Sequence, residues 1–323
     1  MTMNDGFPVL PFRSTLYTPG ELLAGFDGDD PESYASTPDL QTYRSTRLGS
    51  TREIGMLRAL HDQCITEARD ELLAGRNVVA VMGGHDMNRA DPVYRSVVEL
   101  TAALASGGAM VASGGGPGAM EASHLGALLS AADKSTRDDA VKRLAIVPEF
   151  PEDTSGLVTA DGVIDPEVLT ELHRWQRPAF AMLDEIPVAD RGESLAVPTW
   201  FYGHEPPTPF ATWIAKYFSN SLREDGLLAV AVDGVVFAPG RAGTLQEVFQ
   251  DAAQNYYRVF HDRFSPMAFL DHDGCWTNTF PVGPLLETLF GPDDFRRYVC
   301  ISADPGELIQ FLADHAIAAD RLA

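Results

Sequence analysis

One stretch of the sequence combines the residue types of a phosphate-binding loop with an acid. An apolar run at 235–238 leads into Pro239 and a glycine-rich turn, and Thr244-x-x-Glu247 then opens an amphipathic segment. This pattern predicts a strand, a loop and a helix start. The first amides of a helix lack intrahelical partners and the helix dipole adds positive charge, so an anion is favoured there. The predicted phosphate site consists of Gly240, Arg241, Ala242, Gly243 and Thr244.

Glu247 has two interpretations at this stage. Thr244 and Glu247 have the spacing of a capping box, in which both side chains bond the free amides of the helix start. A carboxylate held beside a phosphate loop would also lie near the sugar that carries the phosphate. The spacing alone favours neither role.

Two more glycine-rich segments follow apolar runs. Residues 78–82 and 110–112 are continuously apolar, as is typical of strands buried on both faces of a parallel sheet. The loops after parallel strands open at the carboxyl edge of the sheet, where such sheets bind ligands. We expect further ligand contacts from Gly83, Gly84, Gly114, Gly115, Gly116, Met120 and Glu121.

Some of these residues have simpler explanations. The segment 114–119 superficially matches a dinucleotide fingerprint, but it follows the second predicted strand and no ribose-binding acid follows it, which disfavours a nicotinamide enzyme. Glu121 falls in a first helical turn, where any acid complements the dipole. His85 and Asp86 either face the same crevice or are turn residues.

Strand and helix patterns alternate along most of the chain. This alternation predicts an α/β fold with a doubly wound, mostly parallel sheet in a Rossmann-like three-layer arrangement. Residues 1–49, rich in Pro, Gly, Asp, Ser and Thr, are expected to form an irregular arm. Residues 50–323 are expected to form one domain with an insert at about 130–194. Further strands are expected at 144–147 and 195–201, and a helix from Thr208.

Composition excludes several classes of function. The 323 residues carry a net charge of −22, which disfavours a nucleic acid partner. No apolar run is long enough for a membrane span and no signal peptide is evident, so we expect a cytoplasmic protein. The three cysteines and the scattered histidines have no metal-binding spacing, so no metal is expected. With only three lysines, a Schiff-base enzyme is disfavoured.

The segments SGGGPGAMEA (113–122) and PGRAGTLQE (239–247) resemble the Lonely Guy (LOG) family of cytokinin-activating phosphoribohydrolases. The likeness covers about 77–129 and 195–312. It implies hydrolysis of the N-glycosidic bond of a nucleoside 5'-monophosphate, giving free base and ribose 5-phosphate without a cofactor. The family's catalytic Glu corresponds to Glu247 and its catalytic Arg to Arg223, although the spacing from Arg223 to the loop is about one residue longer. Arg241 replaces a glycine of the family motif.

The resemblance also implies a homodimer formed through helices near the active site. Phe249, Tyr256, Tyr257 and Phe260 would give the helix after the loop a large aromatic surface, which could equally pack inside its own subunit. The group that protonates the leaving base is not identified by the sequence; Glu121 is a candidate. Trp200, Phe201 and Tyr202 could stack on the base or belong to the core.

Two other functions stay open. The related molybdenum-cofactor carriers hold a phosphorylated pterin on a similar two-loop sheet without hydrolysing it, so a non-hydrolytic binding protein is the main alternative. A DNA-processing Rossmann protein is disfavoured by the acidic charge.

Overall fold

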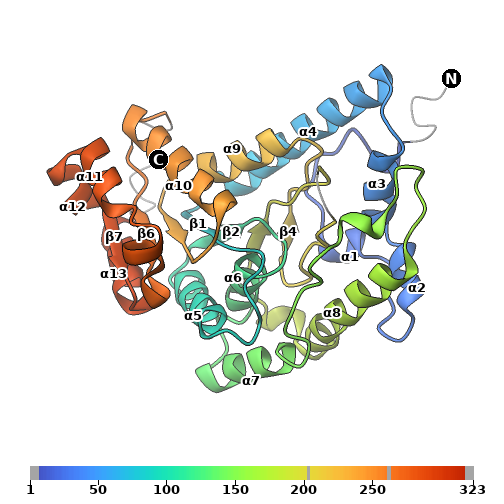
Figure 1. Ribbon diagram of the computed structural model, residues 1–323, viewed down its shortest axis with the longest axis horizontal. Helices are drawn as coiled ribbons and strands as arrows, with labels where there is room; N and C mark the ends of the chain where they lie inside the picture. Colours follow the sequence, from blue (N-terminus) through green and yellow to red (C-terminus); the bar gives the residue numbers. More distant parts are fainter. Residues whose placement is uncertain (1–6, 202–203, 260–262, 317–323) are drawn as a thin grey trace.

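The computed structural model describes residues 7–201, 204–259 and 263–316 (Figure 1). Its described part contains a seven-stranded sheet in the order β4-β3-β2-β1-β5-β6-β7, and every neighbouring pair is parallel. The prediction of a doubly wound α/β fold is confirmed. The strands are β1 (Val78–Met82), β2 (Met110–Ser113), β3 (Ser194–Ala196), β4 (Trp213–Ile214), β5 (Val235–Phe237), β6 (Met267–Leu270) and β7 (Val299–Ser302).

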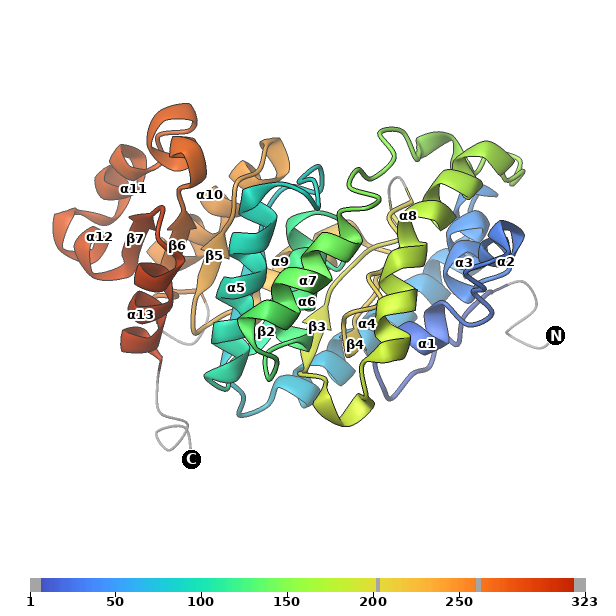
Figure 2. The same cartoon turned by 90° about the horizontal axis from the view of Figure 1, so that it is seen from below.

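Helices cover both faces of the sheet (Figures 1 and 2). Side chains of a strand alternate between its two faces: Val79 and Val81 pack with α5, α6, α7 and α13, whereas Ala80 and Met82 pack with α4, α9 and α10. The main helices are α4 (Arg52–Leu73), α5 (Pro92–Ser106), α6 (Ala119–Leu128), α7 (Lys134–Leu144), α8 (Pro166–Glu185), α9 (Asn220–Val230), α10 (Ala242–Tyr257), α11 (Gly283–Phe290), α12 (Pro292–Tyr298) and α13 (Pro305–His315).

Helix starts follow the capping chemistry of the sequence. Proline occupies the first turn of α5, α8 and α13, where its missing N–H costs nothing. Asp165 and Asp304 accept hydrogen bonds from first-turn amides of α8 and α13. The structure also contains short helical turns: η1 (Ser155–Leu157), η2 (Val188–Asp190), η3 (His272–Gly274) and the π-turn η4 (Cys275–Thr279). No helix of these residues is long and apolar enough to cross a membrane.

Two predicted elements are wrong. Residues 144–147 are not a strand: Leu144 ends α7, because this residue continues the apolar helical stripe of Ala140 and Val141. The segment after Thr208 is not a helix but leads into β4, whose flanking amides bond β3 carbonyls, with Ala215 N–H donating to Ala196 O over 2.8 Å. Pairing with a neighbouring strand overrides the local helical pattern there.

The N-terminal segment also differs from the prediction of an irregular arm. It forms α1 (Pro19–Leu22), α2 (Pro31–Ala35) and α3 (Pro38–Arg47), each too short to show a clear period in the sequence. Each begins with an N-cap Thr or Asp followed by proline. Tyr34, Leu40 and Tyr43 are buried in the same core cluster as the sheet. Tyr17 forms an antiparallel bridge with Ile214 of β4.

A fully buried ion pair fixes the loop after β1. The guanidinium of Arg89 donates to both carboxylate oxygens of Glu121, at 2.7 and 2.6 Å, and Tyr94 donates its hydroxyl to the same carboxylate over 2.8 Å. Arg89 also lies 3.9 Å from the ring centroid of Trp175. Glu121 is in the first turn of α6, so the pair ties the β1–α5 loop and α8 to the start of α6.

Replacing Arg89 by leucine should lower the free energy of unfolding by about 3–5 kcal/mol, because Glu121 would stay buried without its cation. Denaturant unfolding of the two proteins measures the difference. The matched control is Arg143→Leu, which removes an exposed pair with Glu185 and should cost less than about 1 kcal/mol. An equal fall in the free energy of unfolding in both variants would show that burial does not increase the cost of breaking the Arg89–Glu121 pair.

Candidate active site

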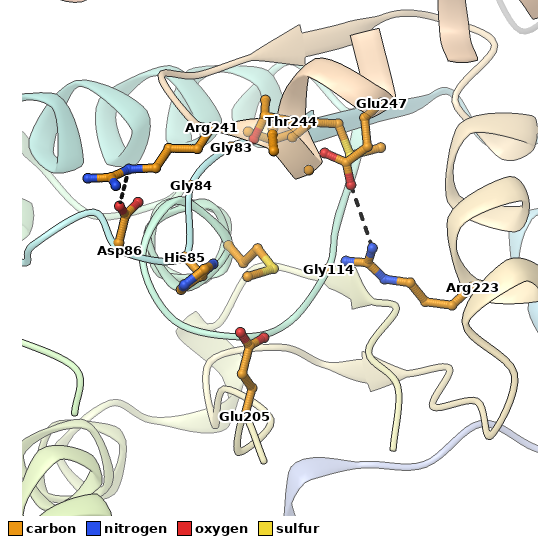
Figure 3. A pocket seen from close by; sticks show the side chains of 15 residues that line it. Gly83, Gly84, His85, Asp86, Gly114, Glu205, Arg223, Arg241, Thr244 and Glu247 are labelled. Carbon is orange, nitrogen blue, oxygen red and sulfur yellow. Dashed lines mark ion pairs between the residues drawn. The ribbon is translucent and has the colours of Figure 1, made fainter. Parts of the chain in front are cut away.

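A pocket of about 270 Å³ opens at the carboxyl ends of β1, β2 and β5 (Figure 3). The sheet order reverses between β1 and β5: the chain runs outward through β2, β3 and β4 on one side and through β6 and β7 on the other. Such a switch point leaves a crevice in which open α/β sheets bind ligands. The predicted site residues that line the pocket are Gly83, Gly84, Gly114, Met120, Arg223, Arg241, Ala242, Gly243, Thr244 and Glu247.

Three predicted glycines shape the loops without lining the pocket. An added Cβ at Gly115, which has a φ of +79°, would lie 2.7 Å from the Ala196 Cβ. At Gly116 it would lie 2.5 Å from Glu205 Oε2, and at Gly240 it would crowd the Thr244 side chain and lie 3.0 Å from the Gly84 amide nitrogen. Positions 115 and 240 need glycine because the loops pack closely against one another there, whereas at position 116 the contacts are with the ends of the Glu205 and Met120 side chains.

The expectation that Glu121 faces a ligand requires correction. Its side chain is fully buried, and both carboxylate oxygens are bonded to Arg89. Glu121 is not among the residues that line the pocket. The Glu121 carboxylate complements the helix dipole at the start of α6 and, through Arg89, holds the loop after β1 in place. This is the structural role that its position in the first helical turn indicated.

The capping-box interpretation of Glu247 is also wrong. The helix α10 begins at Ala242, two residues before Thr244, with Arg241 as the N-cap and no side-chain capping bond. Glu247 therefore lies in the second turn, and its Oε1 faces Arg223 Nη1 at 3.5 Å. Its carboxylate points into the pocket, while Ala242 and Gly243 bring first-turn amides to the pocket wall (Figure 3).

Arg223 is held rigidly on α9. Its Nε donates to the Val197 carbonyl over 2.9 Å, and its side chain is mostly buried. Its guanidinium passes so close to Gly114 that a Cβ there would collide with it. The loop after β2 thus needs a glycine at 114 to admit Arg223, which presents its remaining N–H groups to Glu247 and the pocket.

The protonation of Glu247 is shifted toward neutral pH. Burial raises the pKa of its carboxyl from 4.5 to about 7; Arg223 opposes the rise and Glu224 adds to it. Glu205, on the segment between β3 and β4, also lines the pocket. Burial raises the pKa of the Glu205 carboxyl too, partly offset by His85, Arg223 and Lys216. The pocket therefore contains two carboxyl groups that hold protons more strongly than in water.

An exposed ion pair spans two of the pocket loops. Arg241, after β5, and Asp86, after β1, lie 2.9 Å apart from Nε to Oδ2 (Figure 3). The Arg241 side chain is 85% exposed, so it can leave Asp86 and meet an anion at little cost. His85 lines the pocket beside Asp86, so these two residues face the crevice rather than acting only as turn residues.

Sequence reasoning missed Glu205. It lies in an irregular segment of prolines and aromatic residues with no motif spacing, and only the folded loop brings it against Gly116. Trp200 is buried in the core and donates its indole N–H to Asp39 over 2.8 Å, Phe201 is exposed, and Tyr202 lies outside the described residues.

Sheet order and pocket position together define a Rossmann-like α/β protein with a crevice at its switch point. The chain is similar to the solved structure of TM1055, a Northeast Structural Genomics Consortium target, at 19% identity and a TM-score of 0.42; the alignment covers 74% of this chain and 99% of that one. This likeness is distant. No protein-family model and no curated protein matches the sequence.

Replacing Glu247 by glutamine should stabilise the fold at alkaline pH. The native carboxyl keeps its proton up to about pH 7, whereas the unfolded one loses it near 4.5, so native stability falls as pH rises between these values. Glutamine removes this loss, which is on the order of 3 kcal/mol above pH 8. Thermal unfolding at pH 4 and pH 8 measures the effect.

At pH 4 the two proteins should unfold at similar temperatures, because both side chains are then neutral in both states. Glu193→Gln, at an exposed pair with Arg76, is the control and should change little at either pH. A Glu247→Gln protein that is destabilised at pH 8 would contradict the argument.

Proposed function

We propose that this protein hydrolyses the N-glycosidic bond of nucleoside 5'-monophosphates, releasing free base and ribose 5-phosphate. The observation that carries the proposal is the position of Glu247: a half-buried carboxyl, 3.5 Å from Arg223, in the same pocket as the start of α10. In this one crevice the start of α10 would bind the phosphate of the nucleotide, and Glu247 and Arg223 would lie beside its sugar.

The phosphate would bind at the start of α10. Ala242, Gly243 and Thr244 all line the pocket, and first-turn amides together with the helix dipole favour an anion there. Arg241 would turn from Asp86 to the phosphate and form charge-assisted hydrogen bonds. A phosphate in this position places the attached ribose toward Glu247, one turn further along the same helix.

Glu247 would act on the anomeric carbon. Breaking the ribosyl bond develops positive charge on the sugar, which a nearby carboxylate stabilises, and the same carboxylate can deprotonate the attacking water. A base with a pKa of about 7 is matched to reaction near neutral pH. Arg223 would keep the Glu247 carboxylate oriented and bond the ribose hydroxyls. The resemblance of PGRAGTLQE (239–247) to the LOG family motif supports the same role for Glu247.

Incubation with AMP, GMP, CMP, UMP, IMP and isopentenyl-AMP, followed by chromatography, should reveal free base from at least one of them. Glu247→Ala should lower this rate by at least ~10²-fold, because it removes the proposed base and charge stabiliser. Nucleotide binding, followed by calorimetry, should persist, because the α10 amides and Arg241 are unchanged. Glu193→Gln, outside the pocket, should retain the wild-type rate.

An unchanged rate in Glu247→Ala would rule out the proposed mechanism. Binding of nucleotides without release of base from any of them would favour the non-hydrolytic alternative. In that case a fluorescent pterin should co-purify with the protein, and Arg241→Gly would test whether the arginine in place of the family's glycine blocks hydrolysis.

We also propose that the protein forms a homodimer through α10. Phe249, Tyr256 and Tyr257 are 42%, 52% and 75% exposed on this helix, and Val259 follows with 57%. Large apolar side chains gathered on one helix are typical of interaction surfaces. The fourth aromatic residue of the predicted surface, Phe260, lies outside the described residues.

Light scattering should give twice the 35.0 kDa of one chain. Tyr257→Glu should shift the mass to that of a single chain, because a charge would be buried at the interface without a partner. Phe12→Glu, at an exposed apolar residue of the N-terminal segment, is the control and should leave the mass unchanged. A wild-type mass of 35.0 kDa would contradict the dimer.

A further inference from the structure

Glu205 faces Glu247 across the pocket. The two carboxyl groups enter from opposite walls, Glu247 from α10 and Glu205 from the segment between β3 and β4, and both point toward the space between them (Figure 3). The Glu205 carboxyl lies against the backbone of Gly116 in the loop after β2. A sugar held near Glu247 would therefore direct its base toward the wall that carries Glu205.

Burial shifts the Glu205 carboxyl toward its protonated form. The charged and titratable groups that act on it are His85 from the β1 loop, Arg223 from α9 and Lys216 after β4. Each of these lowers the pKa of the Glu205 carboxyl, but burial raises it by more. Arg223 lies within 3.5 Å of Glu247 and Lys216 lies 2.7 Å from Asp39, so both cations are already paired with another carboxylate.

The N-terminal helices hold the segment that carries Glu205. The neighbouring residue, His204, is buried and bonds the hydroxyl of Tyr34 from α2. Asp39 of α3 binds Lys216 and accepts the indole N–H of Trp200. Charged and polar groups buried in this way are costly to move, so the backbone on both sides of Glu205 is fixed by contacts with the N-terminal segment.

We propose that Glu205 is a second catalytic residue, the general acid that protonates the leaving base. This inference rests on the proposed hydrolase function. The C1'–N bond breaks and its electron pair goes to the base, while the Glu205 carboxyl gives its proton to a ring nitrogen of that base. A water oxygen forms the new bond to C1' and loses a proton to Glu247. Proton exchange with solvent then returns Glu205 to its acid form and Glu247 to its carboxylate form.

Two substrates with different leaving groups test the assignment. A nucleoside 5'-monophosphate needs protonation of its base, whereas 4-nitrophenyl ribofuranoside 5-phosphate releases a stable nitrophenolate without a proton. Glu205→Gln should lower the rate with the nucleotide by ~10²–10⁴-fold and the rate with the nitrophenyl substrate by less than about tenfold. Glu247→Gln should lower both rates strongly. Turnover of the nitrophenyl substrate also shows that the Glu205→Gln protein is folded.

The pH profile gives a second measurement. As pH increases, the wild-type rate with the nucleotide should first rise as Glu247 ionises and then fall as Glu205 loses its proton. With the nitrophenyl substrate, the fall at higher pH should be absent. Glu185→Gln, an exposed glutamate paired with Arg143, is the control and should behave as wild type.

The outcomes separate the two proposals. If the wild-type protein releases base from no nucleotide, the proposed function and this inference both fail. If the wild-type protein does release base, two results for Glu205→Gln would overturn its general-acid role: an unchanged rate with the nucleotide, or an equal fall in rate with both substrates. In either case the hydrolase function stands.

Discussion

The structure depends on the divergence of the chain at β1 and β5. These two strands pair in parallel at the centre of the sheet, yet the chain leaves β1 toward α5 on one face and leaves β5 toward α10 on the other. Their loops touch where they part, with the Gly84 amide bonding the Pro239 carbonyl over 3.0 Å. Beyond that contact the described residues leave a pocket between the two loops, as the strand order leads one to expect.

The charges in the pocket nearly balance, although the chain as a whole is strongly acidic. Three carboxyl side chains line it (Asp86, Glu205 and Glu247), against Arg223 and Arg241. Each arginine is paired with one of the acids, and burial raises the pKa of the third acid, Glu205, which disfavours its charged form. An anionic ligand therefore meets a site close to neutrality despite the net charge of −22, and oriented amides at the start of α10 provide the remaining attraction.

Sequence predicted the parts of the site that depend on local rules. Apolar runs and glycine turns located β1, β2 and β5, and nine of the ten predicted residues that line the pocket follow these strands. The tenth, Arg223 on α9, was predicted from the family resemblance. Long-range contacts account for the misses. The position of Glu205 depends on α2 and α3, and the two-residue β4 is held by pairing with β3 and by the bridge to Tyr17. The start of α10 precedes the capping-box spacing that Thr244 suggested. None of these contacts has a signature in nearby residues.

The bridge between Tyr17 and Ile214 has a consequence for self-association. The strand β4 forms one border of the sheet, where unpaired amides and carbonyls would invite the strand of another molecule. Tyr17 donates to the Ile214 carbonyl over 3.0 Å and accepts from its amide over 2.8 Å, so the N-terminal segment occupies that border. The N-terminal segment, which also supports the pocket wall, thus protects the chain against edge-to-edge aggregation. Without this segment, the amides and carbonyls at the free edge of β4 could pair with a strand of another molecule.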